Sequence, residues 1–163
     1  KNNSGFVINF ERSLGETLSR ENSFENSFKD RHKKLSQTDI VTRYVDAYNQ
    51  KDLAEMMQYA AQNIKWMSVD GNNISTETQN KKELIQALKQ HFSRSNKSHS
   101  SLSGVVESDP FVTAIEKSSS YKKGNKSSYC SLSIYEFVKE NSQSHVHPNL
   151  IKNVWYYTAQ KCD

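Results

Sequence analysis

Apolar side chains recur every three or four residues between positions 36 and 60, a spacing typical of amphipathic helices. The apolar positions are Ile40, Val41, Tyr44, Val45 and Tyr48, followed by Leu53, Met56, Met57 and Ala60. Ser36 or Thr38 can cap the first helix and Asp52 the second, because their side-chain oxygens accept from orphan backbone amides. Two helices joined at a tight corner are therefore predicted.

The pattern then changes to alternation. Residues 64–69 alternate loosely and run into Asp70 and Gly71, a turn signal that predicts a hairpin with a short strand at 74–77. Residues 81–92 return to helical spacing before a serine-rich stretch that continues to Ser100. Four further strands are predicted at 102–107, 111–116, 128–139 and 150–159.

This order of elements predicts an α+β domain with three helices on one face of an antiparallel sheet. Four consecutive strands leave no room for crossover helices, which excludes parallel α/β winding. Hydrophobic residues make up 34% of the 163 positions and concentrate at 40–70 and 101–160, enough for one core. The predicted organisation is a polar N-terminal arm at 1–35 followed by one domain at 36–163.

The arm carries an apolar stripe at helical spacing within an otherwise polar segment. Its members are Val7, Phe10, Leu14, Leu18, Phe24 and Phe28. We expect this helical stripe to gain order by packing against the domain or a dimer mate, the alternative being a passive linker.

The net charge of +4 is a small difference between 22 basic and 18 acidic residues. Basic clusters occur at 31–34 and 121–126, but nucleic-acid binding would need exposed aromatic residues interleaved with them, so no nucleic-acid partner is predicted. No apolar run approaches the ~20 residues that span a bilayer, so no membrane partner is predicted. The chain starts at Lys1; it would be periplasmic or secreted if a signal peptide had been removed, and otherwise cytoplasmic.

Cysteine and histidine positions indicate neither a disulfide nor a metal site. Across the predicted last hairpin, Cys130 lies opposite a residue a few places before Cys162, so two separate thiols are expected; the alternative, a disulfide, would need the C-terminus to bend back. His145 and His147 could share one metal, but a third ligand is missing and Pro148 indicates an exposed hairpin tip. Phosphate-loop, zinc and dinucleotide-binding glycine patterns are absent, so no metal and no cofactor are predicted.

Four segments together resemble the nuclear-transport-factor-2-like (NTF2-like) superfamily, and within it the SnoaL-like domain with its ketosteroid-isomerase-like fold. The segments are residues 43–53 (RYVDAYNQKDL), 64–66 (IKW), 133–137 (SIYEF) and 151–157 (IKNVWYY). The resemblance covers 38–159 and implies a cystatin-like roll, in which a cone-shaped curved antiparallel sheet wraps around three helices. The arm is extra to this pattern.

The resemblance to ketosteroid isomerase implies a tyrosine on the first helix, an aspartate base on the first strand and a protonated acid beside the tyrosine. Matched motif to motif, the tyrosine is Tyr44, but the base falls near Ser68 and the second acid near Ser133. Because a serine cannot abstract a carbon-bound proton unaided, that reaction is not predicted, and no catalytic residue is assigned.

Several aromatic residues on the apolar faces are expected to converge inside the cone and bind a small apolar molecule, core packing being the alternative for each. Alternation along the last strand places Asn153 on the same face as Trp155. The predicted ligand-binding residues are Tyr44, Tyr48, Trp66, Phe92, Tyr135, Asn153, Trp155 and Tyr157.

Three classes of function remain open: a pocket that binds without catalysis, an isomerase, lyase or hydrolase acting on a polycyclic or terpenoid substrate, and a protein-association module. Aromatic residues on both faces of the last hairpin predict a homodimer through the outer face of the sheet, namely Tyr129, Tyr135, Phe137 and Tyr156. A pair of buried carboxylates in the cone would favour the enzyme, an open apolar cavity without such a pair would favour binding, and a filled cone would favour association.

Overall fold

A computed structural model describes residues 35–94, 98–122, 124–139 and 149–162. The predicted arm and its apolar stripe lie outside these ranges, apart from Leu35. No helix within the described ranges is long and apolar enough to cross a membrane.

Within the described ranges, three helices form where the helical spacing predicts them: α2 (Gln37–Gln50), α3 (Leu53–Gln58) and α4 (Lys81–Arg94). The Ser36 side chain accepts from the backbone N–H of Asp39, whose carboxylate accepts from the N–H of Ser36 in return, which makes a capping box. Lys51 adopts a left-handed conformation (φ 57°) that ends α2, and Asp52 caps α3. The predicted corner is confirmed.

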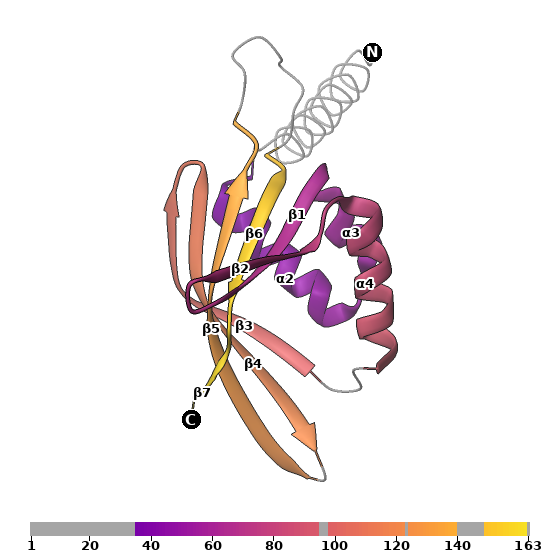
Figure 1. Ribbon diagram of the computed structural model, residues 1–163, viewed down its shortest axis with the longest axis vertical. Helices are drawn as coiled ribbons and strands as arrows, with labels where there is room; N and C mark the ends of the chain where they lie inside the picture. The colour runs from indigo at the N-terminus through magenta and orange to yellow at the C-terminus, as the bar shows by residue number, and fades with distance from the viewer. Residues whose placement is uncertain (1–34, 95–97, 123, 140–148, 163) are drawn as a thin grey trace, which may run out of the picture. The chain divides into compact units, whose positions relative to one another are not determined.

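Seven strands form one curved sheet, in the order β2-β1-β6-β5-β4-β3 with β7 paired to β5 (Figure 1). The strands are β1 (Ala60–Asp70), β2 (Asn73–Thr78), β3 (Ser98–Ser108), β4 (Phe111–Lys122), β5 (Asn125–Phe137), β6 (Ile151–Tyr157) and β7 (Gln160–Lys161). Neighbouring strands are antiparallel except β1 and β6, which run parallel. The α+β class and the curved sheet of the prediction are confirmed.

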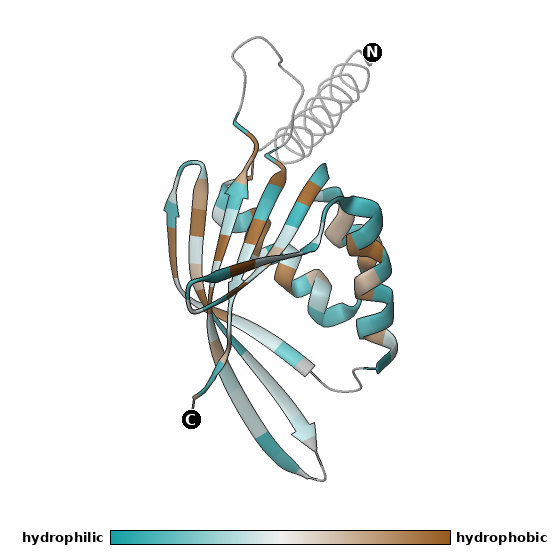
Figure 2. Ribbon diagram, viewed as in Figure 1, coloured by the Kyte–Doolittle hydropathy of each residue, from teal (hydrophilic) through white to brown (hydrophobic). Residues whose placement is uncertain are grey.

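Several elements begin or end at other residues than predicted. Ala60, expected in the second helix, instead starts β1, where it pairs with Ile151. Strands β3, β4 and β5 extend through serine-rich stretches, with Ser98 opposite Ser120 and Ser119 opposite Ser128. The hydrogen bonds between strands come from the backbone and need no apolar side chains, so hydropathy alone does not reveal this extension. The extended parts are pale in Figure 2, which marks intermediate hydropathy.

The core lies between the helices and one face of the sheet, on the side that α2, α3 and α4 cover in Figure 1. Its least exposed large side chains are Val41, Met56, Ile64, Val112, Tyr135, Phe137, Ile151 and Val154. On β5, buried Ser131, Ser133, Tyr135 and Phe137 alternate with more exposed residues, so every second side chain faces the helices.

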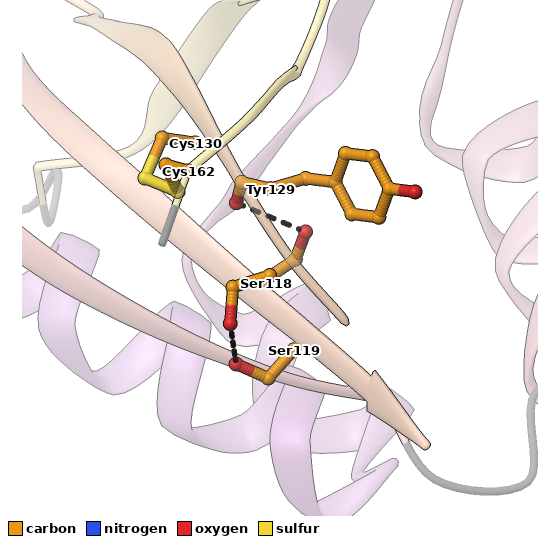
Figure 3. Close-up of a disulfide and its surroundings, with 6 residues drawn as sticks. Ser118, Ser119, Tyr129, Cys130 and Cys162 are labelled. Atoms are coloured by element: carbon orange, nitrogen blue, oxygen red, sulfur yellow. Dashed lines mark hydrogen bonds between the residues drawn. A yellow bond between two sulfur atoms is a disulfide. The ribbon is translucent and has the colours of Figure 1, made fainter. Parts of the chain in front are cut away.

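Cys130 and Cys162 form a disulfide, so the prediction of two separate thiols is wrong (Figure 3). β6 ends at Tyr157, and β7 continues along β5, where Gln160 pairs with Cys130. Cys162 therefore lies two places beyond the residue opposite Cys130, as expected, but this offset does not prevent the bridge. The backbone N–H of Cys162 then donates to the carbonyl of Ser128, and the two cysteine Cα atoms lie 5.7 Å apart. This separation is typical of disulfides.

The homodimer remains a prediction, but its four supporting aromatic residues were expected on both faces of the last hairpin, and three of them lie on the inner face. Tyr135 and Phe137 are buried in the core, and Tyr156 lines the cavity described below. The outer face nevertheless exposes 47% of Ile115 and 41% of Leu132, which pair across β4 and β5. An apolar patch of this kind is typical of an interface.

Sedimentation velocity at micromolar concentration checks this expectation. We expect the wild-type chain to sediment as a dimer and Leu132→Lys to sediment as a monomer, because a charge would be buried at the contact. A wild-type chain that sediments only as a monomer would contradict the prediction.

Candidate functional site

A cavity of about 470 Å³ lies between the helices and the inner face of the sheet. Its apolar wall comes from the helices, through Val45, Met56, Leu84, Ala87 and Leu88. Five aromatic residues from α2 and the sheet add to the wall: Tyr44, Tyr48, Trp66, Tyr135 and Tyr156. The remaining lining residues are polar: Glu77, Thr78, His91, Ser100, Glu116 and Ser118.

The cavity brings together four of the eight predicted ligand-binding residues, namely Tyr44, Tyr48, Trp66 and Tyr135. Phe92 is partly buried against the core and packs on Tyr48, with 5.4 Å between ring centroids, but it does not line the cavity. Asn153, Trp155 and Tyr157 do not line the cavity either.

The prediction chose the wrong face of the last strand. Val154 and Tyr156 face the interior, whereas Trp155 lies opposite Ile134, on the outer face. The pairing of β5 with β6 shifts register near Glu136, so Ile151 and Val154 are both buried although they are three positions apart. Strict alternation counted from Ile151 therefore places Asn153 and Trp155 on the inner face, whereas they lie on the outer face.

Asn153 was predicted to offer its amide to a ligand. Its Nδ2 atom instead donates to Oε2 of Glu136, 2.6 Å away on the neighbouring strand. Tyr157 is 37% exposed. Neither residue contributes to the cavity.

The most informative lining residue is Glu116 on β4, a carboxyl that is only 9% exposed. Ser133 donates a hydrogen bond to its Oε2 atom (2.9 Å), and the Tyr135 hydroxyl donates a longer one (3.4 Å). Burial raises the pKa of Glu116, while hydrogen bonds from Ser133, Ser100 and Tyr135 partly offset that rise. The cavity therefore contains an acid that gains a proton more readily than an exposed glutamate does.

Sequence reasoning missed Glu116, although a signal was present. Val112, Ala114 and Glu116 occupy alternate positions of one strand, which places the carboxyl on the same face as two core residues. The resemblance to ketosteroid isomerase implied an acid near Ser133. That position holds a serine, and the serine hydroxyl binds a carboxyl that comes from the adjacent strand.

The Tyr44 side chain faces the interior, as predicted, and it lies near this acid. Its ring packs edge to face on Tyr135, with 6.3 Å between centroids, and its hydroxyl is buried without a hydrogen-bond partner in the described part of the chain. Burial, together with the nearby Glu116 carboxylate, raises the pKa of Tyr44. The phenol is therefore protonated at neutral pH. A buried hydroxyl without a partner is uncommon and suits a ligand oxygen.

His91 of α4 also lines the cavity. Its Nε2 atom shares a hydrogen bond with the Tyr48 hydroxyl (2.6 Å), and the two rings stack with 5.8 Å between centroids. His91 is exposed and Tyr48 half-buried, so this pair lies where the cavity meets solvent.

His145 and His147 lie outside the described residues. Within the described residues, no group of three His, Cys, Asp or Glu side chains could hold a metal ion.

The raised pKa of Glu116 predicts a pH-dependent effect of Glu116→Gln on stability. An acid whose pKa is raised by folding stabilises the fold below its ordinary value of 4.5, and that contribution is lost as pH rises through the folded-state pKa. We therefore expect Glu116→Gln to raise Tm at pH 8 by a few degrees, since ~1 kcal/mol corresponds to about 2–4 °C. The gain should disappear below pH 4.5.

Thermal melts of both chains across this pH range measure the effect. Glu77→Gln is the matched control, because Glu77 also lines the cavity but is exposed. An equal gain for Glu116→Gln at pH 4 and pH 8 would contradict the assignment.

Comparison with known structures identifies the fold. A loop truncation variant of IdmH aligns with a TM-score of 0.59 and 11% identity over 74% of this chain and 91% of that chain. An uncharacterised cystatin-fold protein from Novosphingobium aromaticivorans aligns with a TM-score of 0.58 and 13% identity over 75% and 97%. An LEH-like epoxide hydrolase of M. tuberculosis aligns with a TM-score of 0.55 and 9% identity over 72% and 78%.

Solved structures of NTF2-like proteins align as well, so the chain has the NTF2-like fold that its motifs resemble. No protein-family model and no curated protein sequence matches the chain. Proteins with this fold include enzymes and proteins of unknown function, so the fold alone does not define an activity.

Proposed function

We propose that this domain binds a small, mainly apolar molecule in the cavity between its helices and sheet, without catalysing a reaction on it. The observation that carries the proposal is an apolar cavity of about 470 Å³ into which helices and sheet both contribute aromatic rings. Ligand pockets commonly have about this volume, with apolar walls and a few polar groups that orient the ligand.

The polar groups divide into two places. Glu116 and the unpaired hydroxyl of Tyr44 lie on the buried wall, whereas the Tyr48 and His91 pair lies at the solvent side. A bound molecule with one oxygen function can place that oxygen against Tyr44 and fill the rest of the cavity with apolar surface. The cavity is open, and its second carboxyl, Glu77, is exposed rather than buried. An open apolar cavity without a pair of buried carboxylates favours binding over catalysis.

A saturated bicyclic ketone, 2-decalone, is a suitable probe because it is apolar and carries one carbonyl oxygen. Fluorescence of Trp66, which lines the cavity, should change saturably as 2-decalone is added. Trp155→Phe removes the tryptophan of the outer face and leaves Trp66 as the reporter. Absence of saturable binding of 2-decalone and of the two aromatic probes described below would overturn the proposal.

A second candidate is an isomerase, lyase or hydrolase of the same fold, and one observation favours it. Glu116 has a pKa raised by burial and shares the cavity with Tyr44, so it could exchange a proton with a bound molecule. The similar epoxide hydrolase of M. tuberculosis supports the enzyme class in general.

Deuterium exchange separates the two candidates. If Glu116 transfers protons to and from a bound ketone, the wild-type chain should accelerate exchange at the carbons next to the carbonyl of 2-decalone in heavy water, and Glu116→Gln should not. The binding proposal expects saturable binding with exchange at the solvent rate in both chains.

A further inference from the structure

The cavity combines a buried carboxyl with several aromatic rings, and this combination favours a class of ligand that an apolar pocket alone does not. Rings of Trp66 and Tyr156 stack with 6.2 Å between centroids, and both side chains line the cavity together with Tyr48 and Glu116. The negative faces of aromatic rings attract cations, and cages of such rings recognise quaternary ammonium groups.

Among the described residues, those that hydrogen-bond to Glu116 carry no positive charge. Its hydrogen bonds come from hydroxyl groups, those of Ser133, Ser100 and Tyr135. Among the described residues that line the cavity, His91 alone has a basic side chain, and its Nε2 atom is engaged with Tyr48 at the solvent side. Burial, rather than a neighbouring charge, is the main cause of the raised pKa of the Glu116 carboxyl.

We propose that the ligand of this cavity is an apolar organic cation. Its ammonium group lies with the rings of Trp66 and Tyr156 on one side and the carboxylate of Glu116 on the other. A buried carboxylate without a cation is costly, and an ammonium group supplies the missing charge. A quaternary ammonium also has no N–H group that would need a hydrogen-bond acceptor, so an aromatic wall can surround it. This inference rests on the proposed binding function and names the ligand class of the same cavity.

Two probes of the same shape test the inference, namely benzyltrimethylammonium and its neutral isostere neopentylbenzene. Binding of each to the full chain is measured at pH 8 through Trp66 fluorescence in the Trp155→Phe background. We expect the cation to bind at least about 10-fold more tightly than the neutral isostere, which corresponds to about 1.4 kcal/mol.

Two carboxyl variants locate the source of the preference. Glu116→Gln should reduce the preference to less than about 2-fold while the neutral isostere keeps its affinity. Glu77→Gln, which changes the exposed carboxyl of the same cavity, should keep the preference.

The outcomes separate this inference from the proposed function. If the neutral isostere binds at least as tightly as the cation, the cation inference is wrong while binding by the cavity stands. A preference that persists unchanged in Glu116→Gln also overturns it. If neither probe nor 2-decalone binds, the proposed function itself fails.

Discussion

Replacing Ala87 by tryptophan is expected to abolish binding of 2-decalone while leaving the fold intact. Ala87 lies on α4 and lines the cavity, yet its side chain is exposed, so a larger side chain there meets no packed core. The indole would occupy the space that the ligand needs. We expect an affinity loss of at least about 100-fold, which corresponds to about 2.8 kcal/mol.

The neighbouring residue supplies the control. Gln86 is exposed on the same helix but does not line the cavity, so Gln86→Trp should bind 2-decalone like the wild-type chain. Circular dichroism and thermal melts verify that both variants fold. Equal binding by Ala87→Trp and the wild-type chain would mean that the ligand lies elsewhere.

Removing the disulfide is expected to cause a large loss of stability. Cys130 and Cys162 are 32 residues apart, and a closed loop of that length restricts the unfolded chain by about 3–4 kcal/mol. The double variant Cys130→Ser, Cys162→Ser should therefore melt roughly 10 °C lower. Because β7 is a two-residue strand paired only to β5 in the described chain, it should also detach from the sheet.

Thermal melts with and without a reductant test this expectation. Reductant should lower the Tm of the wild-type chain to that of the double variant and leave the double variant unchanged. Hydrogen exchange at the Cys162 amide, which donates to Ser128, would report detachment of β7. A wild-type Tm that does not respond to complete reduction would contradict the stabilising role of the disulfide.

The helices could be predicted because local chemistry fixes them. Apolar spacing identifies the faces of α2 and α4, and the side chains of Ser36 and Asp52 satisfy the first amides of their helices. Tyr44 and Tyr48 were placed correctly because they lie on the apolar face of one uninterrupted helix.

The errors arose where long-range pairing decides the result. The register shift near Glu136 reverses which residues of the last strand face the interior after Ile151. The sequence of that strand does not indicate the shift. The pairing of β7 with β5, which brings Cys162 close to Cys130, is likewise a long-range contact. Glu116 was the avoidable omission, because its alternation with Val112 and Ala114 could be read from the sequence.

A crystal structure of the full chain with 2-decalone tests the central claim most directly. Binding by the cavity predicts density for the ketone among Tyr48, Trp66 and Tyr156, with its oxygen within hydrogen-bond distance of the Tyr44 hydroxyl or of Glu116. A cavity filled by its own side chains, or a ketone bound only outside the cavity, would contradict the claim.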